Sequence, residues 1–141
     1  MAMQFKDLIK WADDNRAAVM ETYRYLHETA EISWGEIKTT EYLCRRLNEI
    51  DISFQTFADH TGVVASWSGG DGPVIALRAD MDALWQYVDG TWKANHSCGH
   101  DAHMTMVLEA LRCLKEVGYR PPGKLKVIFQ PAEETGKALK S

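Results

Sequence analysis

A segment with the pattern of a buried helix, lying between two strand-like runs, constrains the fold of this chain most strongly. Residues 74–78 form a short continuous apolar run, which suits a strand covered on both faces. Residues 101–117 are apolar nearly all round, which predicts a well-buried helix ended by Gly118. Residues 124–129 then alternate as a strand does. This order predicts an α/β sheet with helices on its faces.

The first half of the chain adds further helices and strands. Apolar residues at helical spacing over about residues 4–28 predict one long helix or two abutting ones. Ser33, with Glu36 three residues later, has the spacing of a capping box and predicts a second helix to about Asn48. Strands are expected at 52–57 and 62–67, followed by a turn at 68–73. Cys44 is expected to be a small core residue of the second helix.

Composition narrows the class of protein. The chain has 141 residues, enough for one domain with a real core. Its net charge of −4 gives no basic footprint for nucleic acid, and no apolar run approaches the ~20 residues that cross a bilayer. The first residues lack the pattern of a secretory signal, and three cysteines argue against a disulfide framework. We therefore expect a cytoplasmic protein that binds neither nucleic acid nor membranes.

A dense group of metal-binding side chains lies between residues 96 and 103, which read His-Ser-Cys-Gly-His-Asp-Ala-His. Thiolate, imidazole and carboxylate are the groups that hold zinc and its first-row neighbours. Cys98 and His100 are two residues apart, so in an extended segment they project to the same side. A polar loop with solvated histidines is the alternative, and the density of these residues favours a metal site. We interpret His27 and His60 as structural.

Acidic residues follow both predicted strands of the second half. Asp80 and Asp82 come after residues 74–78, and the pair Glu133-Glu134 comes after residues 124–129. Because ligands gather at the carboxyl ends of strands in such sheets, we expect one shared site. One glutamate of a pair can bind metal while its neighbour moves protons. The two aspartates are expected to bind metal, to orient a ligating imidazole or to cap the strand end.

Three segments in this order resemble the N-terminal half of the M20 metallopeptidase family. They are residues 77–84 (LRADMDAL), 96–103 (HSCGHDAH) and 129–134 (FQPAEE). The nearest branch is that of amidohydrolases acting on N-acyl amino acids, hippurate-type substrates and auxin–amino acid conjugates. Trp85 stands where relatives usually have proline after the Ala-Leu pair, and Ala30 replaces another proline. The resemblance implies a three-layer α/β/α zinc-peptidase-like sheet, truncated, with helices on both faces.

The resemblance also implies roles for individual residues. Cys98, His100 and Glu134 would bind one or two zinc or manganese ions. Glu133 would be the general base that activates water and then protonates the leaving amine. Asp82 would belong to the catalytic group in a supporting position. His96, Asp101 and His103 would support the site, and Asp101 would cap the buried helix.

The implied function is a metal-dependent amidohydrolase that cleaves the amide bond of small N-acyl amino acids. Family members continue beyond this point with a dimerisation domain, the rest of the catalytic domain and two further ligand histidines, whereas no histidine follows His103 here. Residues 1–141 would then be only the N-terminal part of the catalytic domain. The alternative is therefore a catalytically incomplete fragment or remnant with a partial metal site, and a structural zinc module ranks lower. We expect 1–141 alone to have little or no activity and to form homo-oligomers through an exposed truncated sheet.

Overall fold

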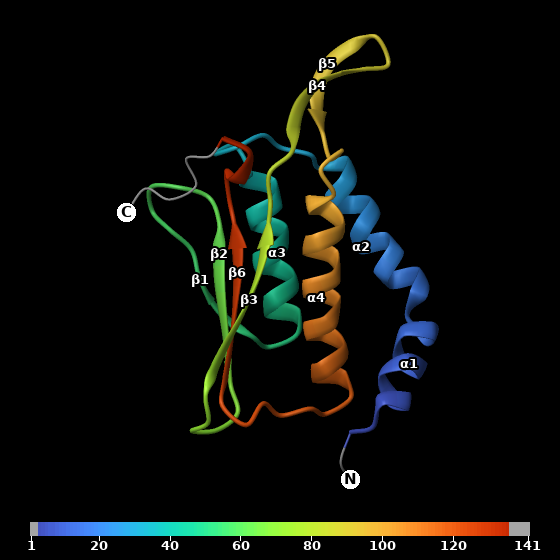
Figure 1. Ribbon diagram of the computed structural model, residues 1–141, viewed down its shortest axis with the longest axis vertical. Coiled ribbons are helices and arrows are strands. Elements are labelled where there is room, and N and C mark those ends of the chain that lie inside the picture. Colours follow the sequence, from blue (N-terminus) through green and yellow to red (C-terminus); the bar gives the residue numbers. More distant parts are fainter. Residues whose placement is uncertain (1–2, 136–141) are drawn as a thin grey trace.

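A four-stranded mixed sheet forms the centre of the protein (Figure 1). The computed structural model describes residues 3–135. In spatial order the strands are β1 (Ser53–Gln55), β2 (Val63–Ser68), β6 (Lys124–Gln130) and β3 (Val74–Asp80). Strand β2 pairs antiparallel with both β1 and β6, whereas β6 and β3 pair in parallel.

The helices lie together on one side of this sheet (Figure 1). They are α1 (Phe5–Asp14), α2 (Arg16–Glu28), α3 (Ile37–Glu49) and α4 (His100–Glu116). Helix α3 contacts β1 and β2, α4 contacts β3, and α2 packs on α4. The buried core contains side chains from the helices and from the sheet, among them Leu26, Leu43, Leu108, Val127 and Phe129. None of these helices is long and apolar enough to cross a bilayer.

The predicted α/β class is confirmed, and the long N-terminal helix is two abutting helices that meet at Asn15. Helices on the second face of the sheet do not occur among residues 3–135. As a result β3 is not covered on both faces as expected: Val74 is 62% exposed and Ile75 is 59% exposed. The position of β3 at the edge of the described sheet, with β6 as its only partner strand, adds to this exposure. Helix α4 is also buried on one side only, since Met106 is 61% exposed.

A β-hairpin was not anticipated from the sequence. Strands β4 (Leu84–Val88) and β5 (Thr91–Asn95) form a separate two-stranded ribbon that projects from one end of the molecule (Figure 1). The two turn residues, Asp89 and Gly90, have φ values of 52° and 85°. Positive φ at both central positions is the geometry of a type I′ hairpin turn, for which Asp-Gly is a favoured pair.

The capping box expected at Ser33 and Glu36 does not form. Helix α3 begins at Ile37, and Glu36 occupies the N-cap position without a side-chain capping bond. Ser33 instead donates from its hydroxyl to the Asp82 carboxylate, and Glu36 accepts from the backbone N–H of Ala132. Both side chains are therefore used in tertiary contacts, which override the local signal.

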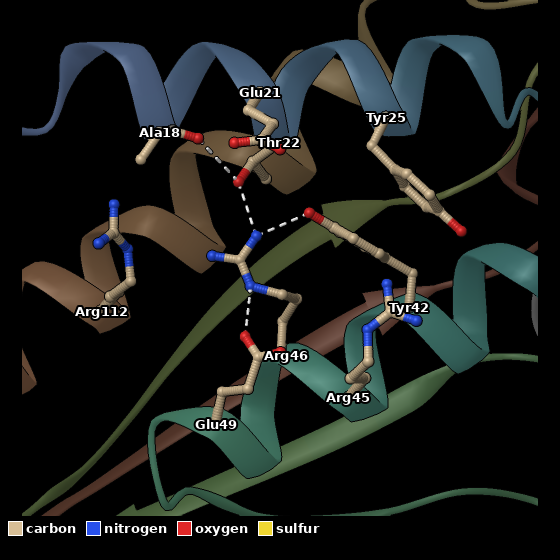
Figure 2. A pocket seen from close by; sticks show the side chains of 9 residues that line it. All are labelled: Ala18, Glu21, Thr22, Tyr25, Tyr42, Arg45, Arg46, Glu49 and Arg112. Carbon is tan, nitrogen blue, oxygen red and sulfur yellow. Dashed lines mark hydrogen bonds and ion pairs between the residues drawn. The ribbon is translucent and has the colours of Figure 1, made fainter.

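A buried ion-pair network ties α2, α3 and α4 together beside a pocket of about 330 Å³ (Figure 2). Arg46 on α3 points across the pocket toward α2, where its Nη1 donates to Thr22 Oγ1 at 2.7 Å. Its Nη2 lies 3.0 Å from Glu109 Oε1 on α4, and Glu109 also accepts from Arg112 Nε at 2.6 Å. Glu109 is only 4% exposed, so its charge depends on both arginines for compensation.

We predict that Glu109→Gln destabilises the fold by about 3 kcal/mol, because two partly buried guanidinium groups lose their carboxylate. Urea denaturation followed by circular dichroism measures the change. The matched control is Glu49→Gln, which removes the other ion-pair partner of Arg46, at a carboxylate that is 55% exposed. That exposed pair should contribute less than about 1 kcal/mol. Equal losses in the two variants would contradict the buried role of Glu109.

Candidate metal centre

The predicted convergence of three chemically active segments is what the structure shows. Strands β3 and β6 are parallel, and Asp80 pairs in register with Gln130, so both strands end at the same edge. Asp82 lies just beyond β3, and Glu133 begins the short 3₁₀ helix η1 (Glu133–Thr135) just beyond β6. The segment with Cys98 and His100 leads into α4 at the same end of the sheet.

Two overlapping groups of side chains have the spacing of metal ligands. Ligand atoms of Cys98, His100 and Glu134 all lie within 4.8 Å of one another, and so do those of Asp80, His100 and Glu133. His100 belongs to both groups, so the two groups lie side by side. Thiolate, imidazole and carboxylate together suit zinc and related divalent ions. Of the two aspartates that the sequence left open, Asp80 is the one in a ligand position.

The orientation of His100 is set by the backbone. Its Nδ1 lies 2.8 Å from the carbonyl oxygen of Asp82, which can only accept a hydrogen bond. Nδ1 therefore carries a proton, and in the neutral imidazole Nε2 keeps its lone pair. That lone pair faces three carboxylates, at 3.7 Å from Glu133 Oε2, 3.8 Å from Glu134 Oε1 and 4.0 Å from Asp80 Oδ2.

Asp80 has one oxygen without a hydrogen-bond donor among the described residues. Its Oδ2 accepts from Arg78 Nη2 at 3.0 Å, whereas Oδ1 is buried and has no partner. A buried carboxylate oxygen without a partner is costly. The oxygen that faces His100 is Oδ2, at 4.0 Å from Nε2, so a divalent cation there would satisfy Oδ1 by binding the carboxylate through both oxygens. The residues present fit such an ion.

The thiol of Cys98 is held in place but not ionised. It donates to the carbonyl of Asp82 with an Sγ–O distance of 3.7 Å. Burial raises the pKa of this thiol, and the neighbouring carboxylate of Glu134 raises it further. Cys98 is therefore protonated at neutral pH until a cation takes the place of its proton.

Asp82 connects these groups. Its side chain is fully buried, and its carboxylate accepts three hydrogen bonds. Oδ1 accepts from the backbone N–H of Glu133 at 3.1 Å, and Oδ2 accepts from that of Glu134 at 3.0 Å. Ser33 Oγ donates to Oδ2 at 2.6 Å. The side chain of Asp82 thus orients the glutamate pair while its carbonyl orients His100.

Two further histidines, His27 and His96, lie near this centre. His27 Nδ1 is 2.7 Å from Asp101 Oδ2, which matches a structural role for His27. Asp101 lies in the first turn of α4 rather than at its N-cap, which is Gly99, and it accepts from the N–H of Ala102. His96 is buried, and burial lowers the pKa of its imidazole. Neither of its ring nitrogens has a hydrogen-bond partner among the described residues.

Comparison with known proteins shows which family this chain is similar to. The profile of Peptidase family M20/M25/M40 matches residues 76–141, which contain all the residues of the two ligand groups. The YXEP protein of Bacillus subtilis, a dinuclear metal binding peptidase from the M20 family, superposes with a TM-score of 0.78 at 34% identity. That alignment covers 89% of this chain and 37% of the other. This chain is related to the M20 peptidases.

Curated relatives come from plants and from bacteria. The chain is 37% identical over 124 residues to IAA-amino acid hydrolase ILR1-like 5 of Arabidopsis thaliana, covering 83% of this chain and 28% of that protein. It is 40% identical over 121 residues to N-acetyl-L-cysteine deacetylase of Bacillus subtilis (strain 168), covering 80% of this chain and 29% of that protein. The chain therefore spans less than a third of the length of these two relatives.

We predict that Asp82→Asn destabilises the protein by about 1–3 kcal/mol, because one backbone N–H of the glutamate pair would face an amide nitrogen instead of an oxygen. Urea denaturation at neutral pH measures the loss. Ser33→Ala is the control, since it removes one donor to the same carboxylate and leaves the backbone contacts intact. It should cost about 1 kcal/mol. A larger loss for Ser33→Ala than for Asp82→Asn would contradict this assignment.

Proposed function

We propose that this chain carries part of the metal centre of a hydrolase that cleaves the amide bond of N-acyl amino acids. The observation that supports it most directly is the free Nε2 of His100, held by the Asp82 carbonyl and facing the carboxylates of Asp80, Glu133 and Glu134. Three side-chain ligands with an open further position are typical of catalytic rather than structural zinc sites.

Each residue of the centre has a distinct role in this proposal. Cys98, His100 and Glu134 would hold one zinc or manganese ion, with His100 binding through Nε2, and the carboxylate of Asp80 would offer a ligand to a second ion beside it. A divalent ion bound there supplies Lewis-acid polarisation of the substrate carbonyl and lowers the pKa of water. Glu133 takes the proton from the attacking water and returns it to the nitrogen of the leaving amino acid. Asp82 holds the backbone of Glu133 and Glu134 in place through their N–H groups.

The substrate class is inferred from the relatives and from the chemistry of the site. One relative is named for IAA-amino acid conjugates and another for N-acetyl-L-cysteine. Both are small amides that join an acyl group to an amino acid. A carboxylate base beside a divalent ion suits hydrolysis of such a bond, since the amine must be protonated as it leaves.

We predict that the chain binds Zn²⁺ and that Cys98→Ser and His100→Asn weaken this binding by more than about a hundredfold, beyond what loss of an outer-shell partner costs. Isothermal titration calorimetry measures the affinity. Cys44→Ser is the matched control, because Cys44 lies on α3 outside both ligand groups and should leave the affinity unchanged. Equal affinity in all three variants would overturn the metal site.

We further predict that turnover of N-acetyl or N-benzoyl amino acids by the metal-loaded chain, however slow, is lost in Glu133→Gln while Zn²⁺ remains bound. Release of the free amino acid measures turnover. Turnover that survives in Glu133→Gln would contradict the role of Glu133 as proton carrier. Stoichiometric metal without any turnover would agree with the low activity expected of residues 1–141 alone and would support the incomplete-site alternative.

A further inference from the structure

Glu36 is a buried carboxylate to which the proposed chemistry gives no role. It is 0% exposed, although it lies at the N-cap of α3, where a glutamate would ordinarily reach into solvent. Its Oε1 accepts from the backbone N–H of Ala132 at 2.8 Å, and its Oε2 accepts from Thr61 Oγ1 at 2.7 Å. Both oxygens are thus used, and each is directed at a segment distant in the sequence.

The segment that Glu36 holds is the turn directly before the glutamate pair. Ala132 has a φ of 55°, in the left-handed region that a residue with a Cβ seldom adopts. This conformation persists only where the surroundings enforce it. The N–H of Ala132 is buried with it, so the carboxylate of Glu36 supplies the one acceptor that the structure gives this group.

Glu36 and Asp82 together bind three consecutive backbone N–H groups. Glu36 takes that of Ala132, and Asp82 takes those of Glu133 and Glu134. The turn is also packed closely against Gly62, the neighbour of Thr61, because a Cβ at Gly62 would lie 2.8 Å from Pro131 Cδ. The backbone of residues 131–134 is therefore held by two carboxylates and by close packing before either glutamate side chain is placed.

We propose that Glu36 is a positioning residue of the metal centre, which acts through the N–H of Ala132 to place the Glu133–Glu134 pair. The inference rests on the proposed metal site and adds to it a residue that would not itself bind the metal. Burial raises the pKa of the Glu36 carboxyl, while the bonds from Thr61 and Ala132 act in the opposite direction. The role requires an acceptor at this point, and a neutral acceptor also meets that requirement.

The test compares three substitutions. Glu36→Leu removes the acceptor and should weaken Zn²⁺ binding by about tenfold to a hundredfold, the range for loss of an outer-shell partner. Glu36→Gln keeps an amide oxygen for Ala132 and can donate to Thr61, so it should stay within about threefold of the unsubstituted chain. Thr61→Val removes the second bond of the same carboxylate without touching the turn, and it should also leave the affinity nearly unchanged.

A second pair of measurements separates positioning from general loss of stability. The Co²⁺ spectrum reports coordination directly, and it should change in Glu36→Leu but not in Glu36→Gln. Leu47→Ala lowers stability in the core about eleven residues, or ~16 Å, further along α3. It should leave both the spectrum and the affinity unchanged in folded protein.

Hydrogen exchange at the amides of residues 132–134 tests the same idea without metal. These amides should exchange at least tenfold faster in Glu36→Leu than in Leu47→Ala. If Glu36→Leu does not fold, Glu36→Asp shortens the side chain by one methylene and should show the same local increase. Unchanged exchange and unchanged Co²⁺ spectra in the folded variants would overturn the role of Glu36. Absence of Zn²⁺ binding in the unsubstituted chain would overturn the proposed function instead, and the exchange rates would still decide whether Glu36 holds the turn.

Discussion

The buried carboxylate of Asp82 is the contact on which the rest of the centre depends. This carboxylate joins Ser33, 49 residues earlier, to Glu133, 51 residues later. The backbone carbonyl of the same residue accepts from Cys98 and His100. A charge removed from water in this way is tolerated only when hydrogen bonds satisfy it. The bonds that do so are the ones that bring the ligand-bearing segments together, so the stability and the geometry of the centre have the same origin.

Much of this arrangement could be predicted from residue order alone. The apolar run at 74–78 becomes β3 and the alternating segment at 124–129 becomes β6, and their parallel pairing places Asp80 opposite Gln130. Once two parallel strands end at one edge, the residues that follow them must lie close together. The segment at 96–103 joins them because it opens the helix between the strands.

What the sequence could not predict depends on contacts between distant segments. Ser33 and Glu36 have the spacing of a capping box, yet their partners are Asp82 and Ala132, far along the chain. The pair Asp89-Gly90 is a hairpin signal, but the short segments on either side of it lack a clear alternation of apolar and polar residues. The exposure of β3 follows from strand order, which local apolar character does not determine.

The long sequence separation between Asp82 and the glutamate pair has a consequence for folding. A centre assembled from segments about 50 residues apart exists only when the sheet and α4 are both formed, so an unfolded chain cannot present it. Any ion that binds there selects the native state, and at a hundredfold excess over its Kd it would add about 2.7 kcal/mol to the free energy of unfolding. The apparent stability of this chain in a cell would then vary with the supply of the ion.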